Sequence, residues 1–66
     1  MFRNLRAEMA REGITVKKMA ETLNIPVNTL RDKIKGRTEI SLSLAFTIHK
    51  LFFPDIDIFY LFKKEE

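Results

Sequence analysis

Two glycines and two prolines divide this chain into short stretches, and they constrain its fold more than any other feature. Gly13 and Gly36 follow segments whose apolar residues recur at three- and four-residue steps, where a glycine ends a helix in the left-handed conformation. Pro26 starts a helix and Pro54 stops one, because proline fixes φ and has no N–H to donate. The sequence therefore predicts an all-α protein made of short helices, without strands.

The pattern predicts five helices, which cover about residues 2–12, 16–23 and 27–35, then a fourth after Ser41 and a short fifth after Asp57. Thr15, Ser41 and Asp57 have side-chain oxygens that can accept from the unpaired N–H groups of the turn that follows. We expect the inward face of the fourth helix to be Leu42, Ala45, Ile48, Leu51 and Phe52. The whole chain, residues 1–66, is expected to form a single compact five-helix bundle, which buries only about 60% of the surface of its unfolded form.

Composition excludes several classes of protein. The chain has no cysteine, so it has no disulfide and no cysteine-based zinc site, and its single histidine, His49, has no surrounding carboxylates. We expect no metal, no cofactor, no small-molecule ligand and no enzymatic activity, because the carboxylates are scattered and five short helices barely enclose a pocket. The longest apolar run, residues 58–62, is far below the ~20 residues needed to cross a bilayer, so no membrane association is expected.

Positive charge is concentrated in the middle third of the chain. Residues 17–37 hold six basic and two acidic side chains, whereas the remainder holds six basic and seven acidic ones. A localised basic stretch attracts polyanions, because neutralising phosphates releases condensed counterions. Charge alone leaves open the alternative of an ordinary solvated surface.

The segment from Thr15 to Gly36 has the features of a helix-turn-helix unit. Two short predicted helices are joined by a connector of about three residues, and Ala20 stands where the helices would approach most closely. Ile25 is an inward apolar residue in the turn, and Leu30 anchors the second helix from below. Such a unit holds its second helix away from the body of the protein, so that this helix can enter a major groove.

These residues resemble the helix-turn-helix of the Cro and phage-repressor family, also called the xenobiotic-response-element type. The matching positions are Thr15, Ala20, Asn24, Ile25, the stretch Asn28-Thr29-Leu30, and Gly36. The chain departs from the family pattern at Val16, Pro26 and Lys33, where relatives often have Gln, Ser or Thr, and an aliphatic residue. The resemblance covers essentially the whole chain. It implies a small prophage-like transcriptional repressor, located in the cytoplasm on the bacterial nucleoid, whose partner is double-stranded DNA.

The resemblance also assigns roles to outward side chains. In the predicted recognition helix, the candidate base-reading residues are Val27, Asn28, Arg31 and Asp32. Arg31 suits the O6 and N7 atoms of guanine and Asn28 suits adenine, while Asp32 either accepts from a cytosine amino group or orients Arg31 or Lys35. The candidate phosphate contacts are Lys17, Lys18, Thr29, Lys35, Arg37 and Thr38. The alternative is a solvated helix face on which Asp32 and Lys35 stabilise each other.

Six of the seven aromatic side chains fall in the last third of the chain. A bundle this small can hardly bury all of them, so an exposed apolar patch is expected. We predict a homodimer interface formed by Phe53, Phe59, Tyr60 and Phe62, with the two recognition helices about 34 Å apart on a palindromic site. The alternatives are a monomer whose aromatic residues cover the core, and a protein-interaction module that binds another regulator through this patch. An RNA binder is disfavoured, because no exposed aromatic platform accompanies the basic stretch.

Overall fold

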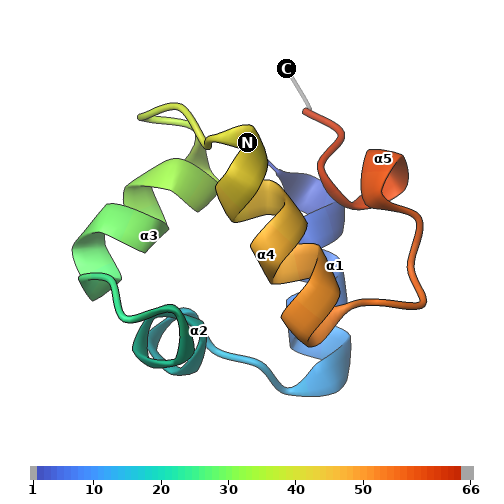
Figure 1. Ribbon diagram of the computed structural model, residues 1–66, viewed down its shortest axis with the longest axis horizontal. Helices are drawn as coiled ribbons and strands as arrows, with labels where there is room; N and C mark the ends of the chain where they lie inside the picture. The colour runs from blue at the N-terminus through green and yellow to red at the C-terminus, as the bar shows by residue number, and fades with distance from the viewer. Residues whose placement is uncertain (1, 65–66) are drawn as a thin grey trace.

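The computed structural model describes residues 2–64, which form five α-helices and no strand (Figure 1). The helices are α1 (Arg3–Glu12), α2 (Val16–Leu23), α3 (Val27–Lys35), α4 (Leu42–Phe52) and α5 (Ile58–Leu61). They pack into a globule of 26 × 24 × 22 Å, with α3 and α5 at opposite ends of the longest axis (Figure 1). The prediction of an all-α five-helix bundle is confirmed. Helices α2 and α3 have the predicted bounds, and α1 begins one residue later than predicted.

Local capping explains where three of the helices begin. Thr15, Ser41 and Asp57 each accept a hydrogen bond from the backbone N–H three residues later, at 3.0–3.1 Å. These bonds satisfy N–H groups that have no acceptor within their own helix. Pro26 begins α3 without a side-chain cap, at a φ of −61° that is already helical. Phe2 precedes α1 with its side chain buried in the core, and its φ of −96° and ψ of 83° are not helical, so the helix starts at the next residue.

Three helices end at a residue with positive φ. Gly13, Asn24 and Gly36 have φ angles of 68°, 59° and 86°, the left-handed conformation that turns a chain away from its helix axis. Asn24 is the one non-glycine residue within 2–64 that adopts this conformation, and asparagine tolerates it better than most residues. Helices α1, α2 and α3 are therefore kept short by the residue that follows each of them.

One core is shared by all five helices. The largest fully buried side chains come one from each helix, and they are Leu5, Met19, Leu30, Ile48 and Leu61. Burying a side chain of this size contributes about 1.5–3 kcal/mol relative to leaving it exposed. Because every helix adds one of these side chains to the same cluster, the position of each helix depends on all the others.

A polar seam joins α1 to α5. Glu8 is 4% exposed, and its carboxylate accepts from the Tyr60 hydroxyl at 3.0 Å and lies 3.6 Å from the Nε of Arg11. Asn4 Nδ2 donates to the backbone carbonyl of Tyr60 at 2.8 Å. The hydrogen bond to Glu8 raises the pKa of Tyr60 above its ordinary value, because the hydroxyl must keep its proton to donate. These contacts compensate the burial of the Glu8 carboxylate and hold α5 against α1.

The structure corrects the predicted inward face of α4. Leu42 and Leu51 are 70% and 54% exposed, so their assignment to the core was wrong. The side chains of α4 that face the core are Leu44, Ala45, Ile48 and Phe52. Helix α4 is apolar around most of its circumference, and spacing alone therefore allows several inward faces. The packing of the other helices selects one of them.

Candidate nucleic-acid interface

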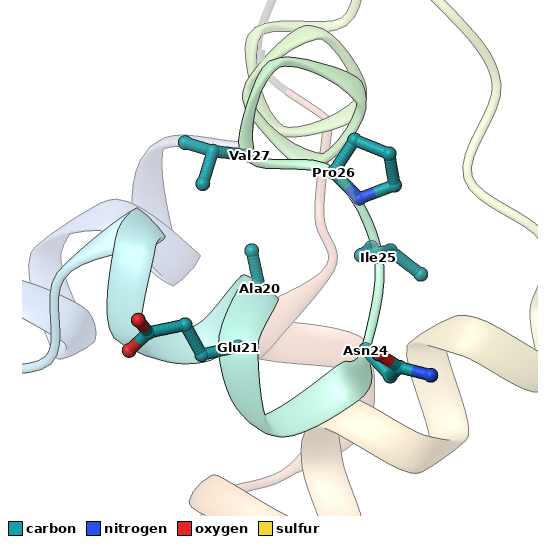
Figure 2. Close-up of a pocket in the computed structure, with 6 residues that line it drawn as sticks. All are labelled: Ala20, Glu21, Asn24, Ile25, Pro26 and Val27. Atoms are coloured by element: carbon teal, nitrogen blue, oxygen red, sulfur yellow. The ribbon is translucent and has the colours of Figure 1, made fainter.

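The turn between α2 and α3 brings the two helices close together. Residues 24–26 connect them, and the N–H of Ile25 donates to the carbonyl of Ala20 at 3.1 Å. Figure 2 shows the methyl group of Ala20 directed across the angle between the helices, toward the start of α3. Ala20 is buried, so a larger side chain there would push α3 away from α2. Leu30, which is fully buried, holds the middle of α3 against the core.

An open hollow of about 520 Å³ lies in the angle between α2 and α3 (Figure 2). It is lined by Ala20, Glu21, Asn24, Ile25, Pro26 and Val27. Of these six described residues Glu21 alone is ionisable, so they do not bring together the several polar groups that orient a small ligand. The groups able to bind a large polyanion lie instead on the outer face of α3 and at the ends of the α2–α3 unit.

The outer face of α3 carries polar and basic side chains. Asn28, Arg31 and Lys35 recur at three- and four-residue steps and are exposed, on the side of the helix away from the buried Leu30 and Ile34. Arg31 Nη1 donates to Asn28 Oδ1 at 2.8 Å, so these two side chains are joined across one turn. Both of these predicted base-reading residues are accessible to a large partner.

The other two predicted base-reading residues lie nearer to the body of the protein. Val27 is half-buried and packs against the core, so only part of its side chain faces solvent. Asp32 is also half-buried, and its Oδ1 lies 3.8 Å from Nη1 of Arg37. The ion pair of Asp32 therefore runs to the loop after α3, and not to Arg31 or Lys35 as the sequence suggested.

The six predicted phosphate contacts are all exposed, and they are Lys17, Lys18, Thr29, Lys35, Arg37 and Thr38. Two lie in the first turn of α2, two lie on α3, and two lie in the loop that follows α3. Lys33 Nζ donates to the carbonyl of Glu39 at 2.9 Å, and this bond holds the loop near the end of α3. This contact of Lys33 was not predicted, because nothing in the spacing of the sequence indicates a bond to a residue six positions later. Lys33 was noted only as a departure from the family pattern.

A second candidate surface lies on α5 and the adjoining part of α4. An apolar groove of about 180 Å³, here called the α4–α5 groove, is lined by Leu42, Ala45, Phe46, Ile58, Phe59 and Phe62. The rings of Phe59 and Phe46 are 84% and 51% exposed. Leu42 and Phe46 were not among the predicted interface residues, although they lie one turn apart on the same side of α4. That spacing was a signal for a shared apolar surface.

The predicted interface residues fall into three environments. Phe59 and Tyr60 are exposed, and Phe62 is half-buried with its ring edge-on to Phe2 at a centroid distance of 5.8 Å. Phe53 is 2% exposed within the core, so its assignment to an interface was wrong. Its backbone leaves the helical conformation at the end of α4, with φ at −137°. The ring therefore points into the core and does not extend the exposed apolar face of α4. Phe53 therefore closes the core, and Phe59 remains exposed.

Metal binding finds no support in the described part of the chain. Among residues 2–64, no group of three or more His, Cys, Asp or Glu side chains is placed to hold a metal ion. His49 Nε2 lies 2.7 Å from the carbonyl oxygen of Ile56, so this histidine ties α4 to the segment before α5. Within the same range, no helix has both the length and the apolar character needed to span a membrane.

In comparisons with known proteins, no family model, no curated protein and no solved structure matches this chain.

Proposed function

We propose that this protein binds duplex DNA at specific sequences and represses transcription by occluding a promoter, with α3 in the major groove. The observation that carries this proposal is the outer face of α3, where Asn28, Arg31 and Lys35 are exposed together on a helix anchored by Leu30. An α-helix fits the major groove, where base edges offer hydrogen-bond partners to such side chains. In this proposal α2 and α3 act as a helix-turn-helix, as the resemblance to the Cro and phage-repressor family implies. The protein would act on the bacterial nucleoid, in the cytoplasm.

The basic side chains around α3 support the same function. Lys17 and Lys18 lie at the start of α2 and Arg37 follows α3, so cationic groups flank the reading helix on both sides along the chain. Contacts of this kind set the position and orientation of a protein on the phosphate backbone without carrying sequence information. Because they release counterions, we expect the affinity for any duplex to fall steeply as salt is raised.

We further propose that two copies associate through the α4–α5 groove. The groove and the exposed ring of Phe59 support this, because a second copy would cover apolar surface that one copy leaves in water. Helix α3 lies at the opposite end of the longest axis from α5 (Figure 1), so both α3 helices would remain accessible. Reading helices one turn of B-DNA apart are separated by about 34 Å. Each copy is 26 Å long along its longest axis, so two copies placed end to end are long enough to span this separation.

A protein-interaction module is the second candidate function, and the same α4–α5 groove favours it. A different regulator would then cover Phe59, and the basic face of the α2–α3 unit would be incidental. The affinity for DNA would stay at the non-specific level, with a dissociation constant of about 10⁻⁴–10⁻⁶ M.

Selection of bound duplexes from a random-sequence library separates these functions, at about 150 mM salt so that non-specific phosphate binding is suppressed. An enriched palindrome with half-sites about 10 base pairs apart would support both DNA reading and the dimer. A single enriched half-site would support DNA reading by a monomer. If the folded protein enriches nothing, DNA reading is rejected and the interaction module becomes the better explanation.

Two variants on the outer face of α3 sharpen this test. Arg31→Ala is expected to lower the affinity by about 1–3 kcal/mol and to relax the preference at one base position. Lys35→Ala, on the same exposed face, is expected to weaken binding about equally for all sequences and to reduce the salt slope by about one. An Arg31→Ala protein with the wild-type preference at every position would contradict the assigned role of Arg31.

A further inference from the structure

The hydrogen bond between Asn28 and Arg31 changes what the outer face of α3 presents to a base pair. Asn28 Oδ1 is the only acceptor atom of its amide group, and it accepts from Arg31 Nη1 at 2.8 Å. To read adenine, an asparagine donates to N7 and accepts from the N6 amino group at the same time. The bond to Arg31 occupies one of the two lone pairs of Oδ1 and directs the amide toward Arg31, so Asn28 is already engaged with its neighbour before a base is met.

The guanidinium of Arg31 keeps its other edge for a partner. A guanidinium has five N–H groups, and the bond to Asn28 uses one of them on Nη1. Within residues 2–64, no protein acceptor bonds to the Nε and Nη2 groups of Arg31. These two parallel donors match the two acceptors of guanine, O6 and N7, in the major groove. The bond to Asn28 also reduces the freedom that a long side chain would otherwise lose on binding.

The carboxylate of Asp32, which follows Arg31 in the chain, does not add an acceptor to this pair. Asp32 is half-buried, and its Oδ1 lies 3.8 Å from Arg37 on the loop side of α3. Adenine and cytosine each present an amino donor in the major groove, and reading them needs an acceptor on the protein. Guanine presents two acceptors, so the donor-rich surface formed by Asn28 and Arg31 suits guanine best.

We propose that Asn28 and Arg31 form a single reader of guanine, in which Arg31 contacts the base and Asn28 is a positioning residue. This inference rests on the proposed function and replaces the separate assignments of Asn28 to adenine and Arg31 to guanine. The ligand is the major-groove edge of a G·C pair in duplex DNA.

Binding to duplexes that differ at one base pair of the selected site tests this inference. The wild type is expected to prefer guanine at one position of each half-site by about 5- to 150-fold, the discrimination of one bidentate contact. Arg31→Ala brings this ratio to about one, and Asn28→Ala lowers it without affecting any other position. Asn28→Asp keeps an oxygen for Arg31, so it retains the ratio although its added charge weakens binding to every duplex. Placing 7-deazaguanine, which lacks the N7 acceptor, at this position is expected to lower the ratio as well.

Lys35→Ala is the matched control, because it removes an exposed side chain from the same face and is expected to leave all ratios unchanged. All four substitutions are at exposed positions, so helical content and thermal unfolding should match those of the wild type. If Asn28→Ala and Asn28→Asp lower the preference for adenine at one position and leave the preference for guanine unchanged, Asn28 reads adenine by itself. That result, or a selected site without guanine, overturns the inference while the proposed function stands. If the folded wild type does not discriminate among duplexes, both are overturned.

Discussion

Replacing Phe59 with alanine should weaken the association of two copies and leave the stability of one copy nearly unchanged, because the ring is 84% exposed. Fully burying a phenylalanine contributes about 1.5–3 kcal/mol, and one copy covers only about a sixth of Phe59. Phe59→Ala is therefore expected to lower the free energy of unfolding of the monomer by at most about 0.5 kcal/mol. In the proposed dimer, covering the rest of both rings contributes about 2.5–5 kcal/mol, so the dissociation constant should rise about 60-fold to several thousand-fold.

Sedimentation equilibrium at several protein concentrations measures the association, and urea unfolding at the lowest concentration measures the stability of the monomer. Phe53→Ala is the matched control, because the same substitution at a ring that is 2% exposed is expected to cost about 3–5 kcal/mol. A domain of this length has a total stability of about 3–10 kcal/mol, so the control should lose between about a third and all of it. An unchanged dissociation constant for Phe59→Ala, or a wild type that stays monomeric, would refute the proposed interface. A monomer destabilised by much more than about 1 kcal/mol would refute the calculation from exposure.

Leu30→Ala leaves a cavity in the shared core, and urea titration is expected to show a loss of about 2–5 kcal/mol; a loss below about 1 kcal/mol would contradict its full burial. Ala20→Leu overfills the contact between α2 and α3, so it should cost about 1–3 kcal/mol and weaken specific DNA binding by displacing α3, as a competition assay against random duplex would show. Gly13→Ala meets no atom within 4 Å, and its expected cost of about 1–2 kcal/mol, measured by thermal unfolding, comes from the positive φ alone. Folding raises the pKa of Tyr60, so its contribution to stability is complete below about pH 10 and is lost as the pH rises through the folded-state value. The stability of the wild type should therefore fall more steeply above pH 10 than that of Tyr60→Phe, and equal slopes would speak against the bond to Glu8.

The bounds of the helices were predictable because their causes are local. Thr15 caps α2 through its own hydroxyl, and Asn24 ends the same helix with a positive φ. Pro26 and Gly36 act in the same way on α3, within one turn of the residues that they affect. Spacing also decides which side chains share a face of a helix, so the exposed Asn28, Arg31 and Lys35 followed from the sequence.

The pairing of charged groups at the candidate site was not predictable in the same way. Asp32 has several cationic side chains within reach along the chain, and the sequence offered Arg31 and Lys35 as partners. The loop after α3 lies near the end of this helix, held by Lys33, and this brings Arg37 to 3.8 Å from the carboxylate. The direction of Asp32 therefore depends on the path of a loop, which periodicity does not describe.

Burial in the last third of the chain was decided by the tertiary structure. Phe53 and Phe59 are the same residue type six positions apart, yet one is 2% and the other 84% exposed, because the chain turns one ring inward after α4. Glu8 shares the inner face of α1 with Leu5, and its carboxylate is satisfied there by Tyr60, 52 positions later in the chain. The sequence by itself determined, to within one residue, where α1, α2 and α3 begin and end, and it determined which residues share a face. Only the packing of one helix on another determined which faces lose their water, because that depends on groups far apart in the chain.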